Sequence, residues 1–216
     1  MSRETIMIIY DGVLLASGGM DSTVLAYDLA QKKLNLIILF LDYGQHCVKK
    51  EYETLKGVLP EIYKKNIRIV KISDIYSESK SRMIIEANLW VDNIVADDLY
   101  LPYRNLLFLS IASAFAQSIE VKNVYAAFIN SNHATEIDCS MEFFTRLEAL
   151  LDVYGSVKVI MPYRMMSKTD VAQLGLSLNV PIASTYSCQV NSQNPCGACP
   201  NCVDRIEAID NIINGV

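Results

Sequence analysis

Histidine, tryptophan and long apolar runs are all scarce in this sequence. Its 216 residues include two histidines and one tryptophan. The longest apolar stretches, 36–41 and 106–116, fall well short of the roughly 20 residues that a membrane-spanning helix requires. Residues 1–10 lack the basic region, apolar block and cleavage site of a secretory signal. We therefore expect no transmembrane segment and a cytoplasmic protein.

Long basic runs are also absent, and the charge balance is acidic. The chain has 19 Lys and Arg against 24 Asp and Glu, a net charge of −5, so electrostatic attraction to nucleic acid has little support. Hydrophobic residues make up 51% of the chain, which excludes global disorder and allows a sizeable core. The length fits one compact α/β domain with a small appendage.

Short apolar runs alternate with segments of helical length and period. We expect strands over 12–16, 36–41, 67–72, 124–128 and 157–160. We expect helices over 22–32, 48–59, 104–119, 141–151 and 167–179. Because the strand runs are almost continuously apolar, helices should cover both faces of the sheet. The predicted fold is α/β, with a doubly wound, mostly parallel five-stranded sheet in residues 1–180 and a C-terminal lobe with a terminal helix in 181–216.

A glycine-rich loop joins the first expected strand to the first expected helix. It consists of Ser17, Gly18, Gly19, Met20, Asp21 and Ser22. The glycines permit positive φ and close backbone approach, the serines offer hydroxyls, and the helix start offers NH groups to an anion. Neither a Walker A loop nor a GxGxxG fingerprint is present. The loop predicts a pyrophosphate cradle, and the alternative is a tight strand-to-helix turn.

The order SGGMDS resembles the SGGxDS loop of the N-type ATP pyrophosphatases, which cut ATP between the α and β phosphates and adenylate an oxygen. The resemblance implies that residues 17–22 bind ATP and that Asp21 and Ser22 are catalytic. A carboxylate beside a polyphosphate needs a bridging cation, so Asp21 is a candidate ligand for Mg²⁺. Its alternative role is the N-cap of the helix.

Four of the six cysteines are crowded near the C-terminus. They are Cys188, Cys196, Cys199 and Cys202. Cytosolic thiols stay reduced, and four thiolates can close a tetrahedral sphere, so the spacing predicts a structural Zn²⁺ site. The alternatives are an iron–sulfur cluster and buried free cysteines. We interpret Cys47 and Cys139 as small buried hydrophobic residues in preference to nucleophiles.

Three further strings extend the resemblance: DYGQ at 42–45, PYRNLLFL at 102–109, and SKTD at 167–170, where Ser167 and Asp170 could cap a helix. With the cysteine tail, they make the chain similar to the 7-cyano-7-deazaguanine synthase family along almost its full length. The resemblance implies an ATP-dependent carbon–nitrogen ligase that converts 7-carboxy-7-deazaguanine and ammonia to the nitrile preQ0 through adenylated intermediates. It also suggests a homodimer.

The same resemblance places several residues in the site. Lys168 and Arg104 would be catalytic cations for pyrophosphate and the transition state, unless they cap helices or pair on the surface. Asp42 would bind the ribose or the adenine of ATP, unless it is an ordinary turn residue. The expected substrate contacts are Tyr43, Gln45, Arg104, Asn105 and Asp138. For Gln45 and Asn105 the alternative is hydrogen bonding within the loop and the helix start.

The segment 130–140 departs from the aromatic and glycine-containing stretch of the family, and only Asp138 and Cys139 align there. One alternative function is therefore a relative that adenylates a deazapurine carboxylate and passes it to an amine on a protein or nucleic acid. Another is a zinc-ribbon binding module with a vestigial nucleotide loop. His46 and His133 are interpreted as polar loop residues. With no set of residues for glutamine hydrolysis, free ammonia is the expected nitrogen source.

Overall fold

The computed structural model describes residues 9–88, 92, 95–129, 140–190 and 193–215. The strands are β1 (Gly12–Leu15), β2 (Leu36–Asp42), β3 (Ile67–Lys71), β4 (Asn123–Tyr125) and β5 (Lys158–Ile160). The α-helices are α1 (Met20–Gln31), α2 (Val48–Val58), α3 (Arg104–Ser118), α4 (Met141–Tyr154), α5 (Lys168–Ser177) and α6 (Pro200–Asn214). The predicted strands and helices are thus confirmed, with bounds that shift by up to three residues.

The five strands form one parallel sheet in the order β3-β2-β1-β4-β5. Val13 on β1 pairs with Ile37 on one side and with Val124 on the other. The strand order therefore reverses at β1, which confirms the doubly wound fold. In such sheets ligands bind beyond the carboxyl ends of the strands at this switch point, here the ends of β1 and β4.

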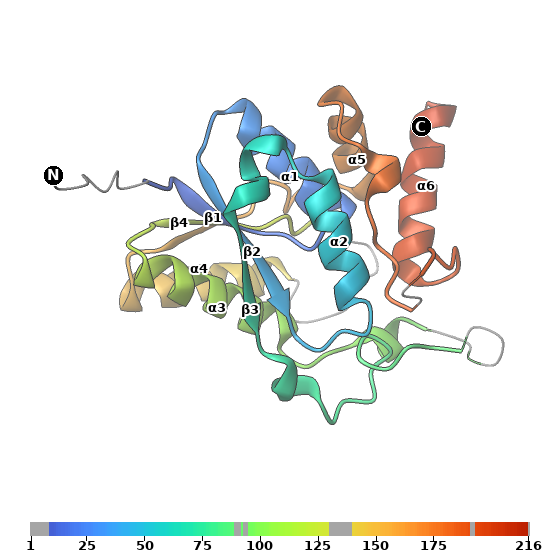
Figure 1. Ribbon diagram of the computed structural model, residues 1–216, viewed down its shortest axis with the longest axis horizontal. Helices are drawn as coiled ribbons and strands as arrows, with labels where there is room; N and C mark the ends of the chain where they lie inside the picture. Colours follow the sequence, from blue (N-terminus) through green and yellow to red (C-terminus); the bar gives the residue numbers. More distant parts are fainter. Residues whose placement is uncertain (1–8, 89–91, 93–94, 130–139, 191–192, 216) are drawn as a thin grey trace, which may run out of the picture.

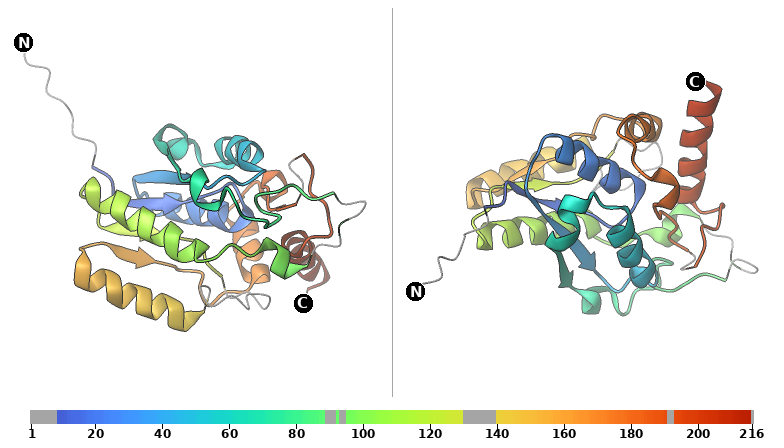
Figure 2. Two further views of the ribbon diagram at one scale, coloured as in Figure 1. Left: turned by 90° about the horizontal axis from the view of Figure 1, so that it is seen from below. Right: turned by 45° about the horizontal axis from the view of Figure 1, so that its top comes forward.

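Helices cover both faces of the sheet, as Figures 1 and 2 show. Leu14 and Phe40 face a core that includes residues of α1, α2, α5 and α6, whereas Val13 and Leu39 face a core shared with α3 and α4. Adjacent strand residues alternate between the two cores because successive side chains of a strand point to opposite faces. This two-sided burial explains the continuous apolar runs in the sequence.

A third core joins the C-terminal segment to the end of β2. It contains Tyr43, Tyr76 and Leu101 together with Tyr186, Cys188 and Cys202. The helix α6 continues this lobe and packs against α5, with Ala208 reaching the core beneath α1 (Figure 1). The cysteine region is therefore packed directly beside the carboxyl ends of the strands.

Local sequence signals explain where two of these helices begin. Ser167 caps α5: its hydroxyl accepts a hydrogen bond from the Asp170 amide at 3.1 Å, while the Asp170 carboxylate accepts one from the Ser167 amide at 2.8 Å. This confirms the predicted cap. Pro200 opens α6 at a position where its missing NH costs nothing. None of the helices in the described ranges is both long and apolar enough to cross a bilayer.

Candidate active site

The glycine-rich loop connects β1 to α1, and its two glycines have different backbone conformations. Gly18 has φ +84°, and a Cβ there would lie 2.7 Å from the Leu55 amide nitrogen of α2. Only glycine fits such a position without displacing the neighbouring helix. Gly19, by contrast, is extended at φ −70° and forms the N-cap of α1. Of the two loop glycines, only Gly18 therefore has positive φ. Because Gly19 is the N-cap of α1, the alternative role of Asp21 as the N-cap is wrong.

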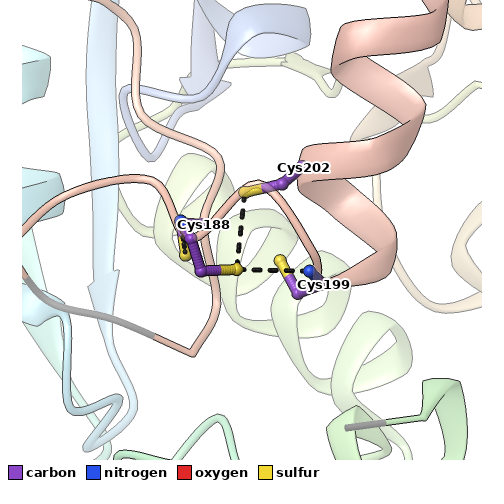
Figure 3. A group of neighbouring side chains, drawn as sticks. Cys188, Cys199 and Cys202 are labelled. Atoms are coloured by element: carbon purple, nitrogen blue, oxygen red, sulfur yellow. Dashed lines mark hydrogen bonds between the residues drawn. The ribbon is translucent and has the colours of Figure 1, made fainter. Parts of the chain in front are cut away.

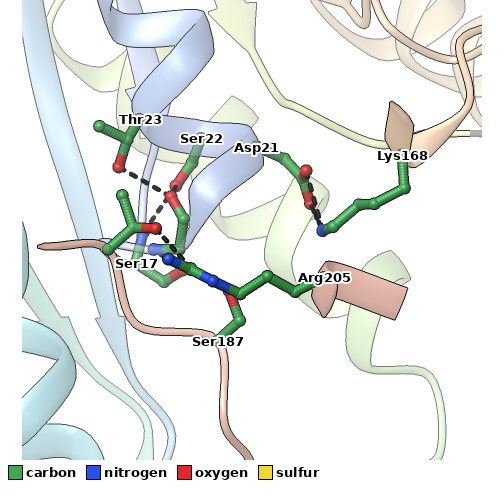
Figure 4. Close-up of polar contacts among 9 residues, drawn as sticks. Ser17, Asp21, Ser22, Thr23, Lys168, Ser187 and Arg205 are labelled. Carbon is green, nitrogen blue, oxygen red and sulfur yellow. Dashed lines mark hydrogen bonds and ion pairs between the residues drawn. The ribbon is translucent and has the colours of Figure 1, made fainter. Parts of the chain in front are cut away.

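Hydroxyl groups fold the loop over the first turn of α1 (Figure 4). The Ser22 hydroxyl donates to the Gly19 carbonyl at 3.3 Å and accepts from the Ser17 amide at 3.4 Å. The Ser17 hydroxyl in turn accepts from the Gly19 amide at 3.4 Å. Because Gly19 has no side chain to cap the helix, the positive end of the α1 dipole faces the loop without a competing carboxylate from the cap position.

Lys168, the first residue of α5, reaches the loop through an ion pair. Its Nζ lies 2.6 Å and 2.9 Å from the two carboxylate oxygens of Asp21. Both side chains are about four-fifths buried, with exposed fractions of 21% and 24%. This contact brings together two residues that the sequence predicts to be catalytic, and it places a cation at the glycine-rich loop.

A cleft of about 270 Å³ opens where β1, β2 and β4 end. The predicted residues in its lining are Ser17, Gly19, Met20, Asp21, Ser22, Tyr43, Gln45, Arg104, Asn105 and Lys168. The structure thus gathers four separate sequence strings around one hollow. Gly18 and Asp42 are outside this lining. Asp138 lies outside the described residues, as do Cys139 and His133.

The turn after β2 uses two of the predicted ligand-binding residues for its own hydrogen bonds. Asp42 Oδ1 accepts from the Gly44 amide at 3.2 Å. Gln45 is 2% exposed; its Oε1 accepts from the Tyr43 amide at 2.9 Å, and its Nε2 donates to the Leu41 carbonyl and to Glu51. The geometry therefore favours the turn alternative for Asp42 and the loop alternative for Gln45.

Arg104 and Asn105 begin α3 and line the same cleft as the glycine-rich loop. The preceding residue, Tyr103, has φ +57°, which turns the chain sharply into the helix. Arg104 Nη1 lies 2.8 Å from Met83 Sδ, and its Nε lies 3.5 Å from Asn105 Oδ1. The start of α3 therefore presents a guanidinium and a carboxamide side by side to the cleft.

The four C-terminal cysteines converge beside this cleft, and Figure 3 shows three of them, Cys188, Cys199 and Cys202. Their Sγ atoms all lie within 4.8 Å of one another. Backbone amides point at the sulfurs: Cys199 N is 3.2 Å and Ala198 N is 3.4 Å from Cys196 Sγ. Amide donors of this kind stabilise thiolates, which are the metal-binding form of cysteine. The group could hold a metal ion, as the sequence predicts.

Comparison with known proteins agrees with these features. The model of the QueC family, described as queuosine biosynthesis protein QueC, matches residues 11–213. The chain belongs to the QueC family. A 7-cyano-7-deazaguanine synthase from Aquifex aeolicus is 34% identical over 94% of this chain and 99% of its own length. One from Picrophilus torridus is 32% identical over 90% of this chain and 85% of its own length.

A solved structure shares the fold. It is described as a predicted subunit of tRNA methyltransferase from Methanocaldococcus jannaschii, and it matches with a TM-score of 0.50 and 17% identity over 78% of this chain and 75% of its own. At that identity the likeness concerns the arrangement of the strands and helices. It agrees with the parallel sheet of this QueC-family chain.

Glu51 is a cleft residue that sequence reasoning missed. It lies in the first turn of α2, lines the cleft, and accepts a hydrogen bond from Gln45 Nε2 at 2.9 Å. Burial raises the pKa of the Glu51 carboxyl, and hydrogen bonds from Gln45 and Cys47 and the charge of Arg104 only partly oppose this. A glutamate in the first turn of a helix is normally solvated, so the sequence carried no signal of this burial. The α2 backbone packs closely on Gly18, where a Cβ would lie 2.9 Å from the Glu51 carbonyl oxygen.

Two other polar residues fit their predicted structural roles. Cys47 is 2% exposed, and burial raises the pKa of its thiol, which opposes the thiolate that a nucleophile needs. His46 Nε2 lies 2.9 Å from the Gln189 carbonyl oxygen and links the turn after β2 to the C-terminal segment. The interpretation of both as structural residues therefore agrees with their surroundings.

Proposed function

We propose that this chain uses ATP to convert 7-carboxy-7-deazaguanine and ammonia into 7-cyano-7-deazaguanine. The observation that carries the proposal is the shared cleft: five residues of the SGGMDS loop line it together with Lys168, Arg104 and Asn105. Membership of the QueC family supplies the substrate class, since the full-length relatives are named for this reaction. The carboxylate must lie between the phosphate loop and the start of α3.

The chemistry needs two activations at one site. A carboxylate oxygen attacks the α-phosphorus of ATP and pyrophosphate leaves, which gives an acyl-adenylate. Ammonia displaces AMP to form the amide and releases a proton. The amide oxygen then attacks the α-phosphorus of a second ATP, pyrophosphate leaves, and the nitrogen loses one proton. Loss of AMP and of the remaining proton on nitrogen leaves the nitrile. The overall reaction consumes two ATP for each nitrile formed.

The residues of the loop would bind the leaving pyrophosphate. The amides of the first turn of α1 and the hydroxyls of Ser17 and Ser22 would donate to its oxygens, and Lys168 would supply a fixed positive charge. Asp21 holds Lys168 at the loop and would also be the ligand for Mg²⁺. When bound, Mg²⁺ neutralises charge on the phosphate oxygens. Arg104 and Asn105 would orient the acceptor and stabilise charge at the reacting phosphate.

The cysteine cluster fits one structural Zn²⁺. In a tetrahedral site with zinc–sulfur bonds of about 2.3 Å, the sulfur atoms lie about 3.8 Å apart. This is within the 4.8 Å limit that encloses the four Sγ atoms. This spacing favours a single ion over an iron–sulfur cluster. All four positions would be protein ligands, so the zinc would stabilise the lobe 181–216 against the domain 1–180 without taking part in the chemistry.

Further features of the proposal come from the family resemblance. The protein would work in the cytoplasm as a homodimer and take free ammonia as its nitrogen source. Transfer of the activated carboxylate to a protein or nucleic acid is not favoured, because the named full-length relatives make a small nitrile. A zinc-ribbon module with a vestigial loop is not favoured either, because the loop lines a formed cleft.

The test is incubation with Mg·ATP, ammonium and 7-carboxy-7-deazaguanine, followed by mass spectrometry and AMP quantification. We expect the nitrile and two AMP per nitrile, with AMP formation that depends on the carboxylate. Lys168→Ala should slow product formation strongly, whereas Lys158→Ala, at an exposed position on β5, should not. AMP release without nitrile would contradict the proposal and point to transfer to another amine.

A further inference from the structure

The segment 185–187 of the C-terminal lobe lies directly against the phosphate loop. The Tyr186 amide donates a hydrogen bond to the Gly18 carbonyl at 3.1 Å. A Cβ placed on Gly19 would lie 3.7 Å from the Tyr186 carbonyl oxygen, so the two backbones are in close contact. The next residue, Ser187, lines the same cleft as Asp21 and Ser22. Its hydroxyl therefore joins the set of polar groups around the loop.

Arg205 holds this segment through hydrogen bonds from its guanidinium group. It lies on α6, one helical turn after Cys202, and its side chain extends toward the loop (Figure 4). Nη1 donates to Thr185 Oγ1 at 2.6 Å and lies 3.5 Å from Ser187 Oγ, while Nη2 donates to the Ile182 carbonyl. One rigid guanidinium thus holds both ends of the segment, because its donors have a fixed fork geometry.

The partners of Arg205 are unusual for a partly buried cation. All three acceptors are neutral oxygens, and no carboxylate within the described ranges forms an ion pair with it. Burial lowers the pKa of Arg205, while the charges of Cys202 and Asp21 oppose that shift. A desolvated guanidinium without a carboxylate is costly, so the hydrogen bonds of Arg205 to neutral oxygens must offset that cost.

We propose that Ser187 is a phosphate-binding residue of the nucleotide site, and that Arg205 is the positioning residue that holds Ser187 against the phosphate loop. The C-terminal lobe then forms one wall of the ATP site in addition to holding the metal. The proposal rests on the proposed function only in taking ATP as the ligand of the loop. The acceptor and the product are not needed for it.

The position of the cysteines strengthens the link. Cys188 follows Ser187 directly in the chain, and Cys202 precedes Arg205 by one turn of α6. Both Sγ atoms belong to the candidate metal site. An ion bound there would fix the segment from one side and the helix that carries Arg205 from the other, so the geometry of Ser187 depends on the whole lobe.

The experiment measures equilibrium binding of an ATP analogue that cannot be cut between the α and β phosphates, with Mg²⁺, by calorimetry. Ser187→Ala should weaken binding about tenfold, because a hydrogen bond to a charged phosphate is lost. Arg205→Ala should weaken it at least as much, and Arg205→Lys should restore part of the affinity. Ile206→Ala, an exposed neighbour on α6, is the control and should bind as the wild type does.

A double variant separates positioning from direct contact. If Arg205 acts through Ser187, the Ser187→Ala change should add little to Arg205→Ala, whereas independent effects would multiply. Metal content and thermal midpoint are measured on every variant. Ser187→Ala should leave both unchanged, because the side chain lines the cleft and its hydroxyl is joined to Arg205 only by a long contact of 3.5 Å.

Two results would overturn the assignment. They are wild-type affinity in Ser187→Ala, whatever Arg205→Ala does to binding and metal content, and full multiplication of the two effects. Nitrile formation is read separately. Wild-type protein that binds the analogue but forms no nitrile refutes the proposed function alone, whereas wild-type protein that binds no nucleotide refutes both.

Discussion

Lys168 and Asp21 are 147 positions apart in the sequence, and the Lys168 ammonium lies 2.6 Å from the Asp21 carboxylate at the start of α1. The pair holds a cation beside the phosphate loop before any nucleotide arrives. In the proposed reaction, a fixed charge costs no reorganisation when pyrophosphate leaves. The Asp21 carboxylate would then be shared between Lys168 and Mg²⁺.

Removal of the Lys168 ammonium should affect rate far more than stability. We expect Lys168→Ala to lower kcat by roughly 10²–10³-fold, the scale seen when one preorganised transition-state donor is removed. Arginine at this position should restore charge but not the compact geometry of an ammonium, so Lys168→Arg should recover only part of the rate. The measurement is pyrophosphate release under saturating ATP. Equal rates for Lys168→Ala and the exposed control Lys158→Ala would show that the ion pair is only structural.

The Gly18 position should tolerate no side chain. Gly18→Ala would put a Cβ 2.7 Å from the Leu55 amide nitrogen at φ +84°, and we expect a loss of about 1–3 kcal/mol in the free energy of unfolding together with weaker nucleotide binding. Gly57→Ala on α2 is the matched control, because nothing lies within 4 Å of its Cβ. A helix gains up to about 1 kcal/mol from that change. Denaturant unfolding would refute the account if the two variants were equally stable.

Glu51 should make stability depend on pH. Burial raises the pKa of its carboxyl in the folded protein above the ordinary value of about 4.3, so the folded state binds its proton more tightly than the unfolded state does. The resulting stabilisation is complete below the unfolded pKa and is lost as pH rises through the folded pKa. Glu51→Gln removes this dependence. In a scan from about pH 4 to about pH 8, the thermal midpoint of Glu51→Gln should exceed that of the wild type by an amount that grows as pH rises.

The exposed Glu53 on the same helix provides the control for that scan. Glu53→Gln should follow the wild-type curve at every pH. A constant difference between Glu51→Gln and the wild type across the scan would contradict the sign of the pKa shift.

The cysteine cluster should behave as a metal-dependent clamp. Cys196→Ser or chelation should remove the metal and lower the thermal midpoint, because binding free energy of a structural ion is also folding free energy. Cys47→Ala changes a cysteine outside the cluster and should keep the metal content of the wild type. Elemental analysis with thermal unfolding checks both. Full metal content in Cys196→Ser would show that Cys196 is not a ligand.

The order of strands and helices could be predicted because both faces of the sheet are buried, which makes strands such as 36–41 almost wholly apolar. The phosphate loop could be predicted because its glycines and hydroxyls are local signals. The inward direction of Glu51, the saturated carboxamide of Gln45 and the grip of Arg205 on segment 185–187 could not, since each depends on how distant elements pack. The sequence left two roles open for Gln45, and it carried no signal for Glu51 or Arg205.

The most direct test of the account is a crystal structure with Mg²⁺ and the uncleavable ATP analogue. The account predicts that the β and γ phosphates lie at the N-terminus of α1, within hydrogen-bond distance of the amides of residues 19–22 and of Lys168. Phosphates bound elsewhere in the cleft, with the SGGMDS loop making no contact to them, would contradict it.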